Sequence, residues 1–235
     1  METTSILITG ASGFVGRHLL NHLAVQEGYR VYTTDRDFSA MFPNPPKKLD
    51  WLIHLASSHR EAEEYMVYEN NKKINRGTIE LLSQFGLSPN ILFTSSIHEN
   101  KDNYYGQSKR DGTSYMESVC DNWGSSFEKI VFPNLFGPYS KPYHTSVVAN
   151  FCSDIISGKE SYINEVEIKL LYVREAINAI MDFRSKEDFE TTTVFLPKLY
   201  KILKRLHTQY NTSPFRIELN NKFESQLLST LTSYY

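Results

Sequence analysis

The first 132 residues alternate two patterns of apolar and polar positions. Short runs rich in Ile, Val and Leu predict buried strands, over residues 5–9, 30–34, 51–55, 91–95 and 128–132. Longer segments with apolar residues at helical spacing predict helices, over residues 13–27, 61–85 and 105–123. Strands that alternate with helices are typical of βαβ units, so this part of the chain predicts an α/β fold with a doubly wound parallel sheet.

Glycine, asparagine and proline set limits on these elements. Gly28 stands where a helix end favours a left-handed residue, so the first helix is expected to end there. The helix over residues 61–85 is expected to be interrupted around Asn70 and Asn71. Residues 37–48 contain three prolines and cannot form a regular helix, so they are interpreted as a loop that replaces a shortened helix layer.

The pattern changes after Phe132. Helices are expected over residues 146–157, 174–183, 196–209 and 221–229, together with a strand pair near Tyr162 and over residues 168–172. The simplest division is a sheet domain over residues 1–135 and a small cap over residues 136–235, interleaved with the sheet domain.

Composition narrows the class of protein. Of the 235 residues, 40% are hydrophobic and 22% are charged, as in soluble globular domains. The net charge of −2 gives no electrostatic case for nucleic acid or an anionic membrane, and no apolar run is long enough to span a bilayer. No secretory signal opens the chain, and two cysteines cannot form a disulfide framework or a zinc site. We therefore expect a cytoplasmic protein with a small-molecule partner.

A glycine-rich segment joins the first expected strand to the first helix. Gly10, Gly13 and Gly16 have the spacing G-x-x-G-x-x-G, in which the first permits a tight turn, the second a close approach to a pyrophosphate, and the third close packing of helix on sheet. This context predicts a Rossmann-like sheet domain that binds a dinucleotide. The predicted contacts along the turn are Gly10, Ser12, Gly13, Phe14, Val15 and Gly16.

Two residues at the end of the second expected strand bear on the choice of coenzyme. Asp35 can accept hydrogen bonds from the adenosine ribose and repels a 2′-phosphate, whereas Arg36 can pair with that phosphate or stack on adenine. The sequence therefore predicts NAD(H) or NADP(H) without choosing between them.

A candidate proton donor begins the helix over residues 105–123. Tyr105 and Lys109 form a Tyr-x-x-x-Lys pair one turn apart on the same helix face. A nearby ammonium lowers the pKa of a phenol, which makes Tyr105 a plausible acid or base. Thr94, Ser95 and Ser96 end the preceding strand at the carboxyl edge of the sheet, where a hydroxyl can hold a carbonyl oxygen.

These motifs resemble the extended short-chain dehydrogenases/reductases, the NAD-dependent epimerase/dehydratase family that acts on nucleotide sugars. The similarity covers residues 9–16, 50–56, 75–78, 93–96, 105–109 and 133–138. It implies that Ser96, Tyr105 and Lys109 are catalytic and that Lys109 also holds the nicotinamide ribose. It also implies coenzyme contacts at Leu55, Ala56, Ser57, Asn75, Thr94, Phe132 and Asn134.

The chain departs from the family in ways that narrow the expected activity. Ser96 and Tyr105 are only nine residues apart, and this short segment is similar to the reductase domain of bifunctional capsular polysaccharide enzymes that make UDP-N-acetyl-L-fucosamine precursors. That resemblance implies reduction of a 4-keto sugar nucleotide without the epimerisation that a separate domain performs. Ile97 and His98 stand where dehydratases of the family carry an extra acid and base.

The remaining predicted contacts are those to the substrate. Around residues 168–175 the usual family arginine is missing, and only Lys169 and Arg174 are cationic. Histidines 18, 22, 54 and 207 are interpreted as structural, and no metal site is expected. The predicted substrate contacts are Ser58, His59, Arg60, Ser96, His98, Asn134, Lys141 and His144, with Tyr143 as a further candidate.

The resulting hypothesis is an NAD(P)-dependent reductase of a nucleotide-linked 4-keto-6-deoxy sugar in surface polysaccharide or deoxysugar biosynthesis. Two alternatives stay open at this point: an epimerase that retains NAD, and a non-catalytic dinucleotide sensor. Family members often dimerise through two long helices, so a homodimer through the helices over residues 61–85 and 105–123 is expected.

Overall fold

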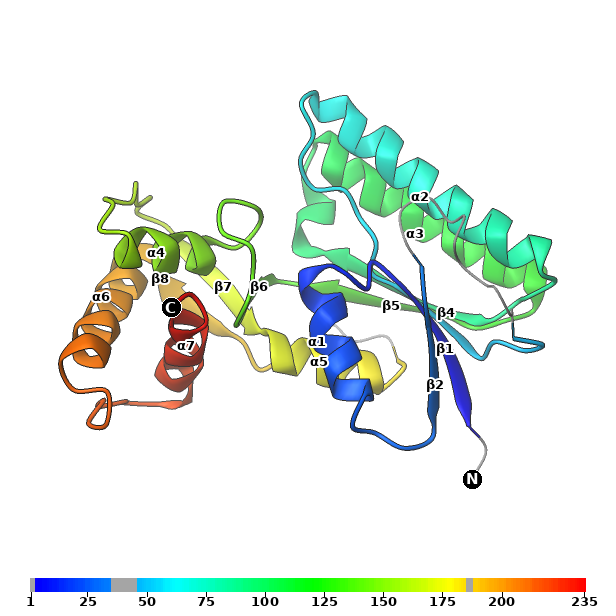
Figure 1. Cartoon of the computed structure of the whole chain (residues 1–235). Helices are drawn as coiled ribbons and strands as arrows, with labels where there is room; N and C mark the ends of the chain where they lie inside the picture. The colour runs from blue at the N-terminus through cyan, green and yellow to red at the C-terminus, as the bar shows by residue number, and fades with distance from the viewer. Residues whose placement is uncertain (1–2, 35–45, 185–187) are drawn as a thin grey trace. The chain divides into compact units, whose positions relative to one another are not determined.

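The computed structural model describes residues 3–34, 46–184 and 188–235 (Figure 1). The chain divides into two compact units. The first consists of Met1–Phe132 and Ile177–Asp188, and the second of Pro133–Ala176 and Phe189–Tyr235. The chain therefore leaves the first unit, returns to it once and ends in the second.

The first unit contains a five-stranded sheet in the order β2-β1-β3-β4-β5, with every neighbouring pair parallel. The chain reverses its direction of winding between β1 and β3, which is where ligands bind in open α/β sheets. The predicted fold class and the five predicted strands are confirmed. The strands are β1 (Thr4–Thr9), β2 (Tyr29–Thr33), β3 (Trp51–His54), β4 (Asn90–Ser96) and β5 (Phe127–Phe132).

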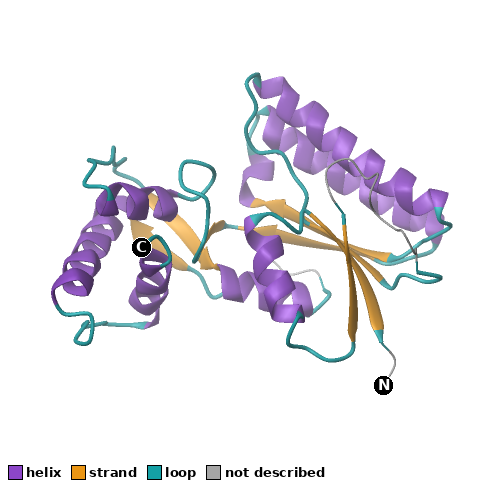
Figure 2. Ribbon diagram, viewed as in Figure 1, coloured by secondary structure: helices purple, strands orange, loops and turns teal. Residues whose placement is uncertain are grey.

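Helices cover both faces of this sheet (Figures 1 and 2). The long helices α2 (Glu64–Gln84) and α3 (Tyr104–Trp123) lie side by side on one face, and α1 (Phe14–Leu23) lies on the other. Alternate residues of the strands point to opposite faces, so one set packs under α2 and α3. That set includes Leu7, Leu52, Ile91 and Phe93, all nearly inaccessible to solvent.

Two expectations about the helices of this unit are wrong. The first helix ends at Leu23, and Gly28, with φ of +88°, lies in the turn that leads into β2. Helix α2 runs without interruption through Asn70 and Asn71, because the Asn71 side chain is buried and has hydrogen-bond partners outside its own helix. Most of the expected loop over residues 37–48 lies outside the described residues.

The second unit packs three helices against a small sheet. Strand β6 (Asn134–Phe136) pairs in parallel with β7 (Glu167–Tyr172), which pairs antiparallel with β8 (Thr192–Phe195). The core is apolar and includes Phe136, Val148, Leu199, Leu203 and Leu227. The helices are α4 (Val147–Ile156), α6 (Leu196–Thr212) and α7 (Lys222–Thr232), and α5 (Val173–Met181) starts here and ends in the first unit.

The strand expected over residues 168–172 is confirmed as β7, but the partner strand expected near Tyr162 is wrong. Tyr162 lies outside any strand and is 88% exposed, so it lacks the burial that holds an aromatic residue in a sheet. The partners of β7 are instead β6 and β8, which are three and four residues long and too short to give a periodic pattern. Within the described ranges, no helix is long and apolar enough to cross a membrane.

Candidate active site

The glycine turn closes tightly between β1 and α1. Gly10 has φ of +69°, and a Cβ there would lie 2.8 Å from the backbone nitrogen of Ala56, just after β3. A Cβ on Gly16 would lie 2.3 Å from the Gly10 carbonyl oxygen. Any side chain at these two positions would push the turn away from its neighbours, so the sequence pattern of glycines is explained by close backbone packing.

The amino end of α1 is suited to a phosphate. Gly13 is its N-cap residue, no side chain of the described residues caps it, and the first turn carries no acidic residue. The first-turn N–H groups therefore point out of the helix toward an anion, with the positive end of the helix dipole behind them. Ser12 is exposed on this turn, and Phe14 and Val15 are half-buried at the start of the helix. This cradle fits the pyrophosphate of a dinucleotide.

A buried histidine links the glycine turn to α2. His54 Nε2 lies 3.0 Å from Asn75 Oδ1, and because an amide oxygen only accepts, Nε2 carries the hydrogen. Nδ1 then accepts from the Thr9 hydroxyl, at 3.0 Å. Burial lowers the pKa of His54 to about 4, and the charge of Lys109 acts in the same direction. The ring is neutral, which agrees with its interpretation as structural.

The segment after β3 is fixed by one asparagine. Asn71 Oδ1 accepts from the backbone N–H of Ser58 at 2.6 Å and from the Ser57 hydroxyl at 3.2 Å. Asn71 Nδ2 donates to the Ser58 carbonyl at 3.0 Å and to the Ser108 hydroxyl on α3 at 2.9 Å. The amide therefore holds residues 57 and 58 against both long helices.

Tyr105, Ser96 and Lys109 gather at the carboxyl end of β4. Burial raises the pKa of Tyr105 to about 12, and hydrogen bonds with the Ser96 and Ser57 hydroxyls oppose that rise. Lys109 is 6% exposed, and its Nζ donates to the Thr94 carbonyl at 3.2 Å. The same Nζ lies 5.8 Å from the centre of the Tyr105 ring. The phenol therefore has two hydroxyl partners, and burial outweighs them, so the lowered pKa expected from the Lys109 ammonium is wrong.

The charge of Lys109 is itself set by its surroundings. Burial lowers the pKa of the Lys109 ammonium to about 8, and the carboxylate of Glu99 opposes this shift. Glu99 lies in the short 3-10 helix η1 (Ile97–Asn100), and its Oε1 is 3.2 Å from Lys129 Nζ. The negative charge of Glu99 therefore favours the charged form of Lys109.

The short connection from Ser96 to Tyr105 packs closely on α3. A Cβ on Gly106 would lie 2.3 Å from the Lys101 carbonyl oxygen. Arg110, one turn further along α3, donates to the carbonyls of Glu99 and Lys101. Asn103 caps the helix by accepting from the Gly106 N–H at 2.8 Å. These contacts allow nine residues to carry the chain from the strand to the phenol.

The structure brings some of the other predicted residues to this place. The His59 ring lies 5.3 Å from the Tyr105 ring, centre to centre. Ser58 donates to Glu61, and His98 donates its backbone N–H to Ser96 Oγ at 3.2 Å. Arg60 is exposed on the same segment as His59. The loop after β3 and η1 therefore both border the phenol.

Other predicted residues are occupied elsewhere. Thr94 Oγ1 donates to the His54 carbonyl at 3.0 Å, and Phe132 is buried in β5. Asn75 is buried against His54, as described above, and Leu55 follows β3 directly. Asp35 and Arg36 lie outside the described residues. Asn134, Lys141, Tyr143 and His144 belong to the second unit.

Sequence reasoning missed Asn71, Ser108, Glu99 and Arg110. One signal was present for Asn71: it stands four residues before Asn75, on the same face of an amphipathic helix as the buried residues. Polar residues at buried helix positions require partners, so two asparagines on the buried face indicate a polar network.

A parallel sheet with a glycine turn at its point of reversal and a Tyr-Lys pair beside it defines a class of dinucleotide-dependent oxidoreductase folds. Residues 6–191 match the model of the NAD dependent epimerase/dehydratase family. The chain belongs to this family, as its motifs predicted.

Three known proteins show how far the similarity extends. The UDP-2-acetamido-2,6-beta-L-arabino-hexul-4-ose reductase of Pseudomonas aeruginosa is 34% identical over 181 residues, which are 75% of this chain and 48% of that protein. The capsular polysaccharide assembling protein CapF of Staphylococcus aureus is 27% identical, with a TM-score of 0.78 over 97% of this chain and 65% of that chain. The chain thus spans about half the length of the curated reductase and two thirds of CapF.

The third similarity supports the fold alone. RMD from Pseudomonas aeruginosa, solved with NADPH, is 17% identical, with a TM-score of 0.79 over 99% of this chain and 97% of that chain. The fold is therefore shared far beyond the range in which sequence is retained.

Proposed function

We propose that this chain is an NAD(P)-dependent reductase of a nucleotide-linked 4-keto sugar. The observation that carries the proposal is that the Tyr105 phenol has the Ser96 and Ser57 hydroxyls as hydrogen-bond partners and that Lys109 Nζ lies 5.8 Å from its ring centre. The similarity to the Pseudomonas aeruginosa reductase supports a UDP-linked 4-keto sugar as substrate. The resemblance to the reductase domain of capsular polysaccharide enzymes further supports a 6-deoxy sugar as the substrate, in surface polysaccharide or deoxysugar biosynthesis.

The residues of the chain supply the proton and hold the reacting oxygen. When bound, NADH or NADPH supplies the hydride for the carbonyl carbon. Tyr105 stays protonated at neutral pH because burial keeps its pKa high, so it can donate to the developing alkoxide. Ser96 is positioned to hydrogen-bond the same oxygen, and Lys109 stabilises the phenolate that remains.

The coenzyme would lie across the glycine turn, with its pyrophosphate at the amino end of α1. The fit rests on the uncapped first turn and on the glycines that cannot carry a Cβ. Lys109 is the proposed contact for the nicotinamide ribose. The choice between NAD(H) and NADP(H) stays open, and Asp35 and Arg36 remain the residues proposed to set it.

The substrate contacts form two groups. Ser58, His59, Arg60 and His98 belong to the first unit, where the His59 ring contacts the Tyr105 ring. Asn134, Lys141 and His144 belong to the second unit. We propose that the sheet domain binds the coenzyme and that the cap adds substrate contacts; the boundary expected at residue 135 lies three residues beyond Phe132, where the first unit's main segment ends.

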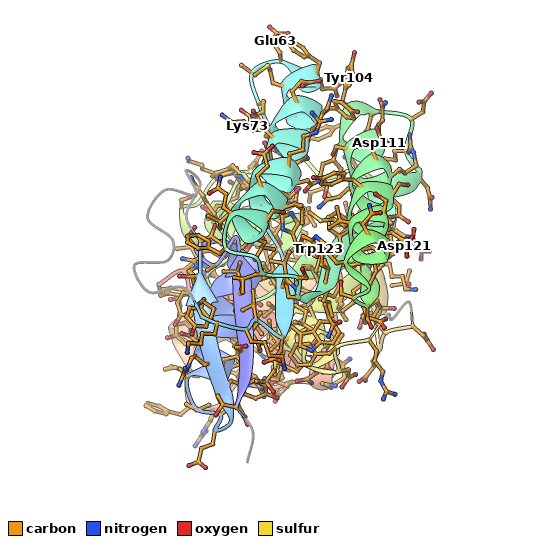
Figure 3. All side chains as sticks on the ribbon, turned by 90° about the vertical axis from the view of Figure 1, so that its right-hand side faces the viewer. Glu63, Lys73, Tyr104, Asp111, Asp121 and Trp123 are labelled. Carbon is orange, nitrogen blue, oxygen red and sulfur yellow. The ribbon has the colours of Figure 1, made fainter. Side chains whose placement is uncertain are left out.

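A homodimer through α2 and α3 is also proposed. Figure 3 shows these helices side by side, with Lys73 on α2 just beyond its N-cap Glu63, and with Tyr104, Asp111 and Asp121 on α3. The two helices are joined by a hydrogen bond of 2.9 Å from the Tyr68 hydroxyl to Asp111. Tyr65 of α2 and Tyr104 of α3 are 50% and 45% exposed and offer apolar area to a partner. The molar mass in solution, measured by light scattering, tests this proposal.

We also propose a cytoplasmic location and a small-molecule substrate. Cys120 and Cys152 are both free and buried, which supports a location in the reducing cytoplasm. Small-molecule substrates, rather than nucleic acid or membranes, are supported by the net charge of −2.

The test is a coenzyme assay with a panel of sugars. NADPH and NADH are each incubated with UDP-, dTDP- and GDP-linked 4-keto sugars, and loss of nicotinamide absorbance is followed. A reductase consumes coenzyme in proportion to ketosugar. Interconversion of sugars without net loss of coenzyme would indicate the epimerase instead, and coenzyme binding without any turnover would indicate the sensor.

A further inference from the structure

Asn71 has an unusually complete set of partners for a buried amide. It is 4% exposed, and its Oδ1 and Nδ2 together make four hydrogen bonds, to the backbone of Ser58 and to the hydroxyls of Ser57 and Ser108. A side-chain amide can accept two hydrogen bonds and donate two. Every bonding position of Asn71 is therefore used, which fixes its orientation.

Both hydroxyls that Asn71 contacts lead to Tyr105. Ser108 Oγ accepts from Asn71 and donates to the Tyr105 carbonyl at 2.7 Å, so the amide is tied to the first turn of α3. The Ser57 hydroxyl is also a hydrogen-bond partner of the Tyr105 phenol and lowers its pKa. One amide thus fixes both the backbone that carries the phenol and a hydroxyl beside it.

The hydrogens can be counted. Ser57 has one hydroxyl hydrogen, and its acceptors within reach are Asn71 Oδ1 at 3.2 Å and the Ser58 carbonyl at 3.4 Å while the phenol keeps its own hydrogen. When Tyr105 gives up its proton, the Ser57 hydrogen can turn to the phenolate. Asn71 Oδ1 then still accepts from the Ser58 N–H, at 2.6 Å, so no buried acceptor is left without a donor.

We propose that Asn71 is a positioning residue for the proton donor: its buried amide holds the Ser57 hydroxyl beside the Tyr105 phenol, and Ser57 stabilises the phenolate formed at turnover. This inference rests on the proposed function, because it assumes that Tyr105 ionises during the reaction. It adds a second hydroxyl, from the loop after β3, to the one that Ser96 supplies from β4.

The variants Asn71→Ala and Ser57→Ala test it, with Asn70→Ala as the matched control. Asn70 is the neighbouring, half-buried asparagine of the same helix. We expect Asn71→Ala and Ser57→Ala each to lower kcat about 10-fold, the effect of one lost hydrogen bond to a charged group. The pH limb assigned to Tyr105 should move up in both, because the Ser57 hydrogen bond that lowers the Tyr105 pKa is lost, with KM for the coenzyme changed less than kcat.

The double variant separates positioning from folding. If Asn71 acts through Ser57, the double variant loses no more activity than Ser57→Ala alone. Additive losses, or an unmoved pH limb in Asn71→Ala, overturn the proposal. If Asn71→Ala does not fold, Ser108→Ala removes one of its partners and is expected to move the same limb in the same direction by a smaller amount, and no movement in it counts against the proposal.

A second readout does not depend on turnover. Tyrosine labelled with 13C at the ring carbon that bears oxygen is followed by NMR against pH, with NAD+ and with NADP+, and Tyr105 is assigned from Tyr105→Phe. The Tyr105 titration should move to higher pH in Asn71→Ala and Ser57→Ala and stay in place in Asn70→Ala. If no sugar is reduced but this titration moves, the proposed function fails and the role of Asn71 stands; an unmoved titration removes the role of Asn71 alone.

Discussion

The two units bury polar groups in different ways. In the first, the buried polar residues Thr9, His54, Asn71, Asn75 and Lys109 gather around the carboxyl ends of β1, β3 and β4. In the second, the core formed by α4, α6, α7 and the small sheet is apolar, and the buried carboxylate of Glu224 on α7 pairs with Arg205 on α6. Both units bury polar groups, but the first gathers several titratable ones at one place, whereas among the described residues of the second the buried charged residue is Glu224, which pairs with Arg205.

That difference indicates where chemistry and stability reside. Burying an ammonium or an imidazole is unfavourable unless partners replace water, and each of these groups has such partners. Such an arrangement is typical of sites in which groups must keep perturbed pKa values. The apolar core of the second unit contributes to stability instead, because burying apolar side chains is favourable. The two units should therefore respond differently to substitution.

The largest expected effect is on chemistry in the first unit. Tyr105→Phe removes the proposed proton donor and is expected to lower kcat roughly 10²–10⁴-fold, the range for general acid catalysis. Tyr104→Phe, at the adjacent and 45% exposed position, is the control and should retain activity. The measurement is steady-state loss of NAD(P)H with the best ketosugar. Unchanged turnover in Tyr105→Phe would remove the proposed mechanism.

The second effect is on stability in the other unit. Leu203 is fully buried in α6, and Leu203→Ala should lower the free energy of unfolding of this unit by about 2–5 kcal/mol, because the cavity loses contacts and transfer energy. Leu219, 41% exposed, is the matched leucine, and Leu219→Ala should cost far less. Denaturant titration measures both. A similar loss in the two variants would contradict the core assigned to this unit.

Much of the first unit could be predicted because its signals are local. The five strands are continuous apolar runs, the glycine turn has a fixed spacing, and Tyr105 and Lys109 lie on one helix turn. Each of these patterns is imposed by the backbone within a few residues. The short spacing between Ser96 and Tyr105 could be recognised from the sequence. The 3-10 helix that part of this segment forms could not.

The parts that escaped prediction depend on partners distant in sequence. Asn71 looked like a helix breaker because asparagine has low helix propensity, whereas its amide is compensated by Ser57 and Ser58 of another segment. Strand β8 follows from its pairing with β7, which its four residues do not reveal. In both cases, contacts with segments distant in sequence determine the structure.

The third effect returns to the buried polar groups and concerns pH. The pKa of His54 is about 4 in the folded state because burial disfavours its charge, and 6.5 is its ordinary value. Between these values the unfolded state binds more protons, so stability is fully present above pH 6.5 and falls by about 3 kcal/mol as the pH drops to 4. His54→Gln should flatten this part of the profile.

Denaturant titration from pH 4 to pH 7 measures that slope. The pKa of Asp50 is lowered to about 2, against burial, by hydrogen bonds and charge from Lys48 and Ser5, so stability from Asp50 is lost only below its ordinary value of 3.8. Its contribution therefore lies outside the His54 window. An equal slope in wild type and His54→Gln would show that another group carries the pH dependence.

The smallest expected effect concerns the ion pair between α6 and α7 in the second unit. Glu224 of α7 lies 2.6 Å from Arg205 Nη2 of α6 and also accepts from the Asn220 backbone N–H at 2.9 Å. The pKa of Glu224 is lowered by these partners although burial opposes it, so its stabilisation is present above pH 4.5 and is lost as the pH falls through the folded value.

Glu224→Gln keeps the shape and removes the charge, and it should lower the free energy of unfolding by about 1 kcal/mol, since Arg205 remains about one third exposed and water screens the pair. The loss should shrink in high salt and below pH 4.5. Glu190→Gln, which alters the 74% exposed partner of Lys222, is the control and should be neutral. If Glu224→Gln cost as much as Leu203→Ala, the second unit would depend on buried charge as the first does, and the contrast between the two units would be lost.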